Sequence, residues 1–396
     1  YVYMNDTFCV LPFTHLATHP NGNVTPCCES KLNPITDGKK LNLNTDSIED
    51  IRRSDSFTNL KNDLKNGIKN KACNFCWKAE EGGLESKRIR DNQRFGVNQI
   101  TQPYFEKNEP LLNVELRLGN ICNMKCLICH PGSSSKWNED IDGFKNVTDD
   151  NLVDYKYKVV IPKEWYRNDN IYENIANQPM LKHLWFNGGE PTLIKEHFKF
   201  LKKLIDKGIS NKITLEYNVN GSYMPDELIE LWKQFFHVYV TISLDDIDDR
   251  VFYSRYPTKF SVVESNIRKL EEHSITYTLI PTISLLNIFN IVQIDEYFTK
   301  HFSKGNSFGI NFVNHPYFLS IGNLSDNHKD VILNNIKNSN LSDIMINEIK
   351  HNMSEPAKVG YGPFIKYINI TDKQRGINIV DYLPEFGELF SHPTLI

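Results

Sequence analysis

The stretch Cys122-Asn123-Met124-Lys125-Cys126-Leu127-Ile128-Cys129 places three cysteines with the spacing C-x3-C-x2-C directly after the apolar run 112–118. Three thiolates this close together can hold three irons of a cubane iron–sulfur cluster, which leaves the fourth iron without a protein ligand. A small molecule can bind at that open iron and be reduced there. Because zinc sites use similar spacings, the rest of the chain has to decide between iron and zinc.

All eight cysteines of the chain lie in its first third. They are Cys9, Cys27, Cys28, Cys73, Cys76, Cys122, Cys126 and Cys129. A secreted disulfide scaffold is usually short and has its cysteines spread along it. Clusters with C-x2-C spacing in a chain of 396 residues are more typical of metal ligation.

The overall composition is that of an ordinary globular protein, with 40% hydrophobic residues, 24% charged residues and a formal net charge of -4. It contains no basic stripe of the kind that a nucleic-acid-binding protein carries. No apolar run is long enough to span a bilayer, and the N-terminus lacks the charged-then-apolar pattern of a signal peptide. We therefore expect a cytoplasmic protein that binds neither nucleic acid nor a membrane.

Residues 113–313 alternate between predicted strands and predicted helices. Strands are predicted at 114–118, 183–186, 213–218, 238–244, 277–283 and 308–312, with helices such as 194–207, 226–235 and 262–273 between them. Such alternation favours parallel strands joined by crossover helices. Six strand–helix units predict an α/β fold with an open, partial barrel, short of the eight units of a closed one. We place this barrel at 106–314.

The N-terminal region, 1–105, is predicted to be a small cysteine-rich domain. Its segment 8–28 predicts a hairpin whose turn is Pro20-Asn21-Gly22-Asn23, because Asn-Gly is a strong signal for a two-residue turn. This hairpin brings the neighbourhoods of Cys9 and Cys27 together.

Two other segments complete the organisation. The long polar stretch 131–179 is predicted to be an insertion in the barrel that contains some helix. The C-terminal region, 315–396, predicts helices at about 327–338 and 341–352, and no element is assigned beyond Pro356. We expect this region to be an α-rich extension.

Four polar or glycine-rich motifs follow predicted strands in chain order. They are the cysteine run 122–129, Asn187-Gly188-Gly189-Glu190-Pro191, Asn218-Val219-Asn220-Gly221, and Ser243-Leu244-Asp245 with Arg255 shortly after. All lie at the carboxyl ends of strands, where barrel active sites are built. Taken singly, a Gly-Gly pair is common in strand-to-helix turns, and an arginine commonly forms an ion pair at the surface. In this combination and order, the chain resembles the radical SAM superfamily.

The resemblance implies the chemistry of the open iron. In that family, the amino and carboxylate groups of S-adenosylmethionine (SAM) chelate the iron, and one electron cleaves the sulfonium to give a 5′-deoxyadenosyl radical. The segment Gly188-Gly189-Glu190-Pro191 resembles the family's GGEP motif, which binds the methionyl amino group. Its glycines let the backbone approach the ligand, and a carboxylate meets an ammonium. Asn220, Ser243 and Arg255 are implied to contact the ribose and the methionyl carboxylate.

Two positions depart from the usual pattern of the family. Ile128 stands where an aromatic residue usually precedes the third cysteine, and it is implied to be an apolar neighbour of the adenine. Asp246 stands where Gly often follows Ser-Leu-Asp. We therefore expect the turn after the strand at 238–244 to differ from that of the family.

The N-terminal cysteines predict a second metal centre. The hairpin supplies Cys9 and Cys27, and Cys73 and Cys76 form a C-x2-C pair at the start of a predicted helix. Four thiolates complete either a 4Fe-4S cluster or a zinc site. The pattern resembles the Twitch and SPASM auxiliary-cluster modules of the same superfamily, although those usually follow the barrel. This resemblance implies an auxiliary 4Fe-4S cluster, and a four-cysteine zinc ribbon is the alternative.

Cys28 is left over from both sets of ligands. We interpret it as a small buried residue or an alternative ligand, and the sharper hypothesis is a catalytic role as hydrogen-atom donor to a substrate radical. The sequence singles out no general base. Lys87, Arg88 and Arg90 lie on a predicted helix and are interpreted as a solvated face, in preference to a surface for an anionic substrate.

The predicted function is that of a radical SAM oxidoreductase or modifying enzyme whose auxiliary cluster relays electrons. Because modules of the SPASM and Twitch kind often serve peptide modification, the resemblance favours a peptide or protein side chain as substrate over a nucleotide, sugar or amino-acid derivative. It also implies an electron donor such as flavodoxin or ferredoxin. The rival from another class is a non-catalytic regulatory protein with zinc in both cysteine sets.

Overall fold

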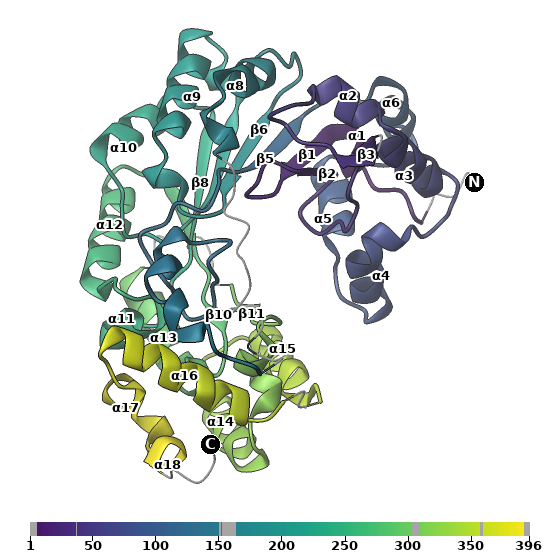
Figure 1. Ribbon diagram of the computed structural model, residues 1–396. Coiled ribbons are helices and arrows are strands. Elements are labelled where there is room, and N and C mark those ends of the chain that lie inside the picture. Colours follow the sequence, from purple (N-terminus) through teal and green to yellow (C-terminus); the bar gives the residue numbers. More distant parts are fainter. Residues whose placement is uncertain are drawn as a thin grey trace. The chain divides into compact units, whose positions relative to one another are not determined.

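The computed structural model describes residues 6–36, 38–149, 152, 164–302, 309–356 and 359–391. It has an α/β fold in which helices connect the strands of a largely parallel sheet (Figure 1). The predicted partial barrel, with a cysteine-rich region before it and an α-rich extension after it, is thereby confirmed. Within the described ranges, no helix is both long enough and apolar enough to cross a membrane.

Seven strands form the main sheet in the order β2-β1-β5-β6-β7-β8-β9. The barrel strands are β5 (Asn113–Arg117), β6 (His183–Asn187), β7 (Thr214–Val219), β8 (His237–Ile242) and β9 (Thr276–Leu279). Pairing is parallel between β5 and β6, between β6 and β7, and between β8 and β9. The first four agree with the predicted strands to within two residues at each end.

The fifth predicted strand, 277–283, is interrupted. It forms β9 and a separate strand β10 (Thr282–Ile283), with Pro281 between them. Proline has no backbone N–H for the ladder, so it favours a break at this point. β10 pairs in parallel with β11 (Asn311–Phe312) in a two-stranded sheet of its own. The prediction of one continuous strand was therefore wrong.

The N-terminal hairpin pairs β1 (His15–Thr18) with β2 (Val24–Thr25), as predicted. At its turn, the amide of Gly22 donates to the carbonyl of His19 at 2.9 Å. β1 also pairs in parallel with β5, with Ala17 opposite Glu115. This second pairing was not predicted, and it extends the barrel sheet by two strands that precede the barrel in the chain. A further short hairpin pairs β3 (Ile35–Thr36) with β4 (Lys39–Lys40).

Gly22→Ala is expected to destabilise the N-terminal hairpin. The added Cβ would lie 2.7 Å from Oδ1 of Asn42 and 2.8 Å from Cγ of Trp165, and the φ angle of +82° disfavours any residue with a Cβ. Strain and overpacking together should lower the free energy of unfolding by roughly 2–4 kcal/mol, measured by chemical denaturation.

Gly208→Ala is the matched control for this variant. Gly208 has a φ of +68°, but nothing lies within 4 Å of the position that an added Cβ would take. It should lose only the roughly 1–2 kcal/mol of backbone strain. Equal losses in the two variants would show that the contacts of Gly22 with its neighbours contribute nothing.

Helices fill the connections and both ends of the chain. Those of the N-terminal region are α1 (Leu11–Thr14), α2 (Ile48–Arg53), α3 (Asp55–Lys65), α4 (Asn74–Glu81), α5 (Lys87–Arg94) and α6 (Gln102–Asn108). Those between barrel strands are α8 (Asp169–Ala176), α9 (Lys195–Asp206), α10 (Asp226–Trp232), α11 (Asp248–Ser254) and α12 (Phe260–Glu272), and α13 (Ile291–His301) lies between β10 and β11. The helices predicted at 194–207, 226–235 and 262–273 are confirmed as α9, α10 and α12. The described part of the insertion, 131–149 and 164–179, contains short helical turns and α8.

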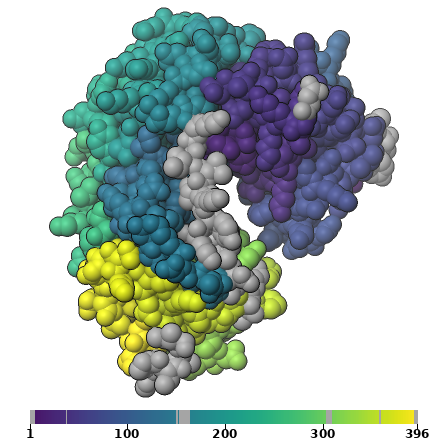
Figure 2. All heavy atoms as spheres, viewed as in Figure 1, coloured from purple at the N-terminus to yellow at the C-terminus, as the bar shows by residue number. Residues whose placement is uncertain are grey.

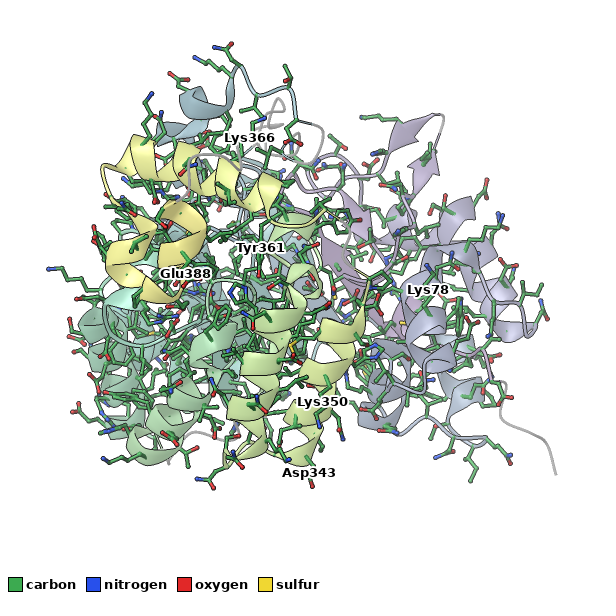
Figure 3. The ribbon with its side chains drawn as sticks, turned by 90° about the horizontal axis from the view of Figure 1, so that it is seen from below. Lys78, Asp343, Lys350, Tyr361, Lys366 and Glu388 are labelled. Atoms are coloured by element: carbon green, nitrogen blue, oxygen red, sulfur yellow. The ribbon has the colours of Figure 1, made fainter. Side chains whose placement is uncertain are left out.

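The C-terminal region is helical. α14 (Asp326–Lys337) and α15 (Asp343–Ser354) confirm the two predicted helices, and the tail that was left unassigned forms α16 (Gly362–Arg375), α17 (Ile379–Tyr382) and α18 (Gly387–Ser391). Asp343 and Lys350 on α15 and Lys366 on α16 are exposed at the surface of this helical region (Figure 3).

The chain divides into two compact units, each with its own hydrophobic core. The first lies within 1–120, 161–217 and 226–238, and the second within 121–160, 218–225 and 239–396. One core of the first unit gathers Phe8, Phe13, Leu60 and Trp77, among others, around the N-terminal cysteines. The large core of the second unit joins the C-terminal helices to the segment after the cysteine run. The domain boundaries proposed at 105 and 314 remain a prediction.

Candidate functional site

Four cysteines of the first unit line a single pocket. Cys9 precedes α1, Cys27 follows β2, Cys73 is the N-cap residue of α4, and Cys76 lies in the first turn of that helix. Cys73 is half-buried and the other three are buried. The rest of the lining consists of Leu11, Glu29, Ser30 and Arg88. The fold thus brings together the four cysteines that the sequence assigned to the auxiliary centre.

Burial suppresses ionisation of these thiols. It raises the pKa of Cys27 well above its ordinary value and the pKa of Cys73 to about 12. The charges that neighbouring thiols would carry add to the shift, from Cys9 onto Cys27 and from Cys76 onto Cys73. Thiolates gathered in this pocket therefore need a compensating positive centre, which a metal ion or an iron–sulfur cluster supplies.

The donor set of the pocket fits an all-cysteine cluster. The pocket presents four thiols from three separate segments of the chain. One cysteine for each iron is the usual ligation of a 4Fe-4S cluster.

Arg88 lies beside the four cysteines and is held there by several contacts. Its Nε and Nη2 donate to the two carboxylate oxygens of Glu80 at 2.9 and 2.7 Å, and its Nη1 donates to the carbonyl of Phe8 at 2.9 Å. Its guanidinium also lies 5.1 Å from the ring centroid of Trp77. Because Arg88 is only 8% exposed, its interpretation as part of a solvated helix face was wrong.

Cys28 is absent from the described lining of this pocket, although it follows Cys27 directly. It is half-buried, and burial raises its pKa to about 12. The side chain therefore carries its S–H hydrogen at neutral pH. A hydrogen-atom donor requires that hydrogen, and the donor role of Cys28 remains a prediction.

The cysteine run 122–129, here called the cluster loop, lies in the second unit. Nη1 of Arg255 lies 3.8 Å from Sγ of Cys126, and Nδ2 of Asn220 lies 3.8 Å from Sγ of Cys122. Burial raises the pKa of Cys126 to about 12. Burial, and then the charges that Cys126 and Cys122 would carry, raise the pKa of Cys129. The three thiols thus lie near enough to one another for their charges to interact. Their role as the ligands of one cluster, with one iron of a cubane left open, remains a prediction.

Asn220 is fixed by two side chains that the sequence did not single out. Its Nδ2 donates to Oδ1 of Asn123 at 2.9 Å, and its Oδ1 accepts from the amide and the hydroxyl of Ser222 at 2.9 and 2.7 Å. Asn123 in turn donates to Oγ of Ser222 at 2.8 Å. Each of these residues adjoins a motif residue in the chain, which is the signal that could have found them.

Arg255 forms a buried ion pair with Asp245. Its Nε and Nη2 lie 2.8 and 3.1 Å from the two carboxylate oxygens. Burial by itself would lower the pKa of Arg255. The negative charges of Asp245 and Cys126 more than offset this effect, so the pKa is raised overall and the guanidinium stays cationic. Asp245 itself accepts from the amide of Thr282 at 2.9 Å. Asp245 belongs to the Ser-Leu-Asp motif, yet only the structure gives it this role. The contact of Arg255 with SAM remains a prediction.

Asp246 organises the turn into α11. Its Oδ1 accepts from the amide of Ile247 at 2.9 Å and from Nδ2 of Asn290 at 2.6 Å, and its Oδ2 accepts from Nε of Arg250 at 2.8 Å. Burial raises the pKa of Asp246 to about 6 against the opposing effect of Arg250. A side chain thus closes a turn at which the family often has glycine.

Ser243 and Ile128 are the other two proposed SAM neighbours in this unit. Ser243 is half-buried, and its amide donates to the carbonyl of Val219 at 2.9 Å. Ile128 is also half-buried and packs against the large core of the second unit. Their contacts with the ribose and the adenine remain predictions.

The segment Gly188–Pro191 lies at the end of β6 in the first unit. Its two glycines have φ angles of 75° and 48°, and a Cβ on Gly188 would lie 2.8 Å from Cβ of Arg117. Glu190 is 1% exposed, and its Oε1 accepts from the amide and the hydroxyl of Thr192 at 3.2 and 2.7 Å. The glycines therefore permit a close approach of two strands, and the proposed contact of Glu190 with the SAM amino group is not tested by this geometry.

Two family models match the chain. The Radical SAM superfamily model matches residues 116–297, and the SPASM iron-sulfur cluster-binding domain matches residues 9–77. The first range contains the cluster loop, and the second contains all four cysteines of the pocket. No curated protein sequence matches the chain.

Several solved structures are similar to the chain at low sequence identity. Native anSMEcpe with bound AdoMet has a TM-score of 0.38 and 18% identity, over 57% of this chain and 63% of that one. SuiB from Streptococcus suis has a TM-score of 0.36 and 13% identity, over 70% and 61%. The radical S-adenosylmethionine methyltransferase TsrM from Kitasatospora setae has a TM-score of 0.36 and 14% identity, over 55% and 39%. The chain spans less than two thirds of the length of each of them.

The two matched domains imply the same cofactors as the cysteine motifs of the sequence: SAM with a 4Fe-4S cluster, and an auxiliary iron–sulfur cluster. A radical SAM domain binds a 4Fe-4S cluster with SAM, and a SPASM domain binds auxiliary iron–sulfur clusters. The chain therefore carries a radical SAM domain over residues 116–297, with a SPASM domain ahead of it over residues 9–77.

Proposed function

We propose that this protein uses SAM to abstract a hydrogen atom from a peptide or protein side chain and passes an electron from the substrate to its auxiliary centre. The observation that carries the proposal is the pair of all-thiol sites, one with three cysteines and one with four. When bound, the two clusters supply one-electron chemistry: reductive cleavage of SAM at one site and uptake of a substrate electron at the other.

The residues of the second unit prepare the first of these reactions. Cys122, Cys126 and Cys129 would hold the cluster and leave an iron open for the amino and carboxylate groups of SAM. Arg255, kept cationic by Asp245, donates toward Cys126 and adds positive charge beside it. A donor to a ligating sulfur stabilises the more negative, reduced state.

The four-cysteine site supports electron transfer over direct binding of the substrate. When four thiolates ligate four irons, no iron remains open. A cluster held by Cys9, Cys27, Cys73 and Cys76 would supply an electron acceptor: the substrate would lose a hydrogen atom to the deoxyadenosyl radical, an electron to this centre and, where the product requires it, a proton to solvent. The net result is a two-electron oxidation of the substrate.

A peptide substrate is supported by the SPASM match. Auxiliary modules of this kind often serve peptide modification in the superfamily, and one similar structure is described as anSMEcpe with bound AdoMet and Kp18Cys peptide. Small molecules such as nucleotides, sugars and amino-acid derivatives are the alternative class. We further propose an electron donor of the flavodoxin or ferredoxin type.

The test begins with protein purified without oxygen. A brown protein that forms 5′-deoxyadenosine from SAM on reduction with dithionite is the expected result. A fully reconstituted protein that forms none would refute the enzyme proposal, and a colourless zinc protein would favour the regulatory alternative. Comparing how far a peptide mixture and a metabolite mixture stimulate deoxyadenosine formation then separates the two substrate classes.

Arg88→Gln is expected to make the auxiliary centre harder to reduce. The substitution removes a buried positive charge that lines the pocket and that favours the more negative state of a bound cluster. The reduction potential of the auxiliary centre, followed by EPR during a redox titration, should shift to more negative values. Arg88→Lys is the matched control because it keeps the charge. Identical potentials in the wild type and Arg88→Gln would contradict this role.

A further inference from the structure

The cluster loop is held by side chains from outside it. Three consecutive carbonyls of the loop each accept a hydrogen bond: that of Lys125 from Nη2 of Arg375 at 2.7 Å, that of Cys126 from Nε1 of Trp137 at 3.1 Å, and that of Leu127 from the hydroxyl of Tyr367 at 2.8 Å. The two donors Arg375 and Tyr367 come from α16, about 250 residues further along the chain.

Backbone amides of the same loop are fixed from another side. The amide of Lys125 donates to the carbonyl of Tyr256 at 2.8 Å, and the amide of Leu127 donates to the carbonyl of Ser254 at 2.9 Å. Ser254 is the last residue of α11, and Tyr256 lies just beyond the helix, with Arg255 between the two. The middle of the cluster loop is therefore fixed through its carbonyls by α16 and through its amides by α11.

A buried ionic network attaches the loop to the end of α16. Asp140 accepts from Nε of Arg375 at 2.8 Å and also pairs with the ammonium of Lys125. The side chains of Arg375, Asp140 and Lys125 are only 1%, 2% and 6% exposed. The guanidinium of Arg375 further lies 5.0 Å from the ring centroid of Trp137. Because removing one partner of such a buried network leaves an uncompensated charge, the geometry of each member depends on the others.

Apolar packing supports the polar contacts. Leu127 is fully buried in the core that contains Trp137, Phe144 and Tyr367. The rings of Trp137 and Tyr367 are stacked with 6.3 Å between centroids, and those of Phe144 and Tyr367 lie 5.8 Å apart. In the space-filling view the C-terminal helices, in yellow, lie directly against the segment that follows the cluster loop (Figure 2).

We propose that α16 is part of the SAM-cluster site and that Tyr367 and Arg375 are positioning residues. They hold the backbone of the cluster loop in the shape that presents its three thiols to one cluster. The C-terminal region, which neither family model covers, thereby gains a role in radical generation. This inference rests on the proposed function, because it assumes that the loop binds the cluster that cleaves SAM.

The test compares Tyr367→Phe and Arg375→Met with the wild-type holoenzyme. Tyr367→Phe removes one hydroxyl and leaves the buried carbonyl of Leu127 without that donor. Each variant should form 5′-deoxyadenosine about 10-fold more slowly or worse. The EPR spectrum of the reduced protein should also change less on addition of SAM than it does in the wild type. Arg375→Lys keeps a cation beside Asp140 and should recover most of the wild-type spectrum.

Tyr253→Phe is the matched control. The hydroxyl of Tyr253 donates to Asp372 of α16 at 2.9 Å, so the variant also loses a contact with that helix but none with the cluster loop. It should unfold at a lower temperature and keep the wild-type response to SAM. The inference is overturned if Tyr367→Phe and Arg375→Met behave like Tyr253→Phe. If the wild type itself shows no SAM-dependent spectrum, the proposed function has failed instead.

Discussion

Cys126→Ala is expected to reduce the formation of 5′-deoxyadenosine from SAM to background, a loss of at least about 100-fold. Cys126 is the buried member of the three cysteines, and its sulfur lies within reach of the Arg255 guanidinium. Two remaining thiols cannot hold a cubane with a single open iron. The product is measured by chromatography after anaerobic reduction with dithionite.

Cys28→Ala is the matched control, because it removes a cysteine that belongs to neither ligand set. It should form deoxyadenosine at the wild-type rate, since donation of a hydrogen atom to a substrate radical comes after SAM cleavage. The Cys126→Ala protein should still show the EPR signal of the auxiliary cluster. Deoxyadenosine formation at the wild-type rate in Cys126→Ala would place the SAM-cleaving cluster elsewhere.

The double variant Cys73→Ala/Cys76→Ala should separate radical formation from turnover. It removes the two pocket cysteines at the start of α4, which are predicted to be ligands. The iron content should fall from about eight to about four per chain, because one of two 4Fe-4S clusters is lost. SAM should still be cleaved on reduction, whereas modified product should disappear because no acceptor takes the substrate electron. Iron analysis and mass spectrometry of the product measure the two outcomes.

Phe75→Ala controls for disturbance of the start of α4. Phe75 lies between the same two cysteines and is 57% exposed, so its removal costs little packing. It should keep full iron content and product formation. Modified product in the double variant at wild-type yield would rule out the electron-relay role, and full iron content there would rule out the ligand assignment.

Local patterns predicted much of the fold and of the candidate site. The Asn-Gly turn at 21–22 predicts the N-terminal hairpin because few residues other than glycine tolerate its backbone angles. The alternation of strands and helices predicts β5 to β8 because each element follows from residues close together in sequence. The cysteines at 122–129 likewise predict a ligand set because their three thiols come from one short segment.

Contacts between distant segments could not be predicted in this way. The parallel pairing of β1 with β5 joins residues about 100 positions apart, and the sequence of neither strand indicates which strand it pairs with. Arg88 has the sequence surroundings of an exposed helical residue, yet Glu80, Phe8 and the pocket surround it. The intrinsic propensity of a residue indicates how well it fits a helix or a strand. Whether its side chain is buried depends on which other parts of the chain pack against that helix or strand.

By itself, the sequence determined the chemistry available to this protein: the cysteine sets, their order and the strand ends that carry the motifs. The tertiary structure alone decided which distant residues hold those groups in place. It set Asp245 against Arg255, Arg88 beside the four-cysteine pocket, and Tyr367 and Arg375 on the cluster loop. The physical reason is that residue type and spacing are enough to predict which thiols can act as ligands. A buried carbonyl or charge, in contrast, needs a hydrogen-bond or ion-pair partner, and only folding brings that partner within reach.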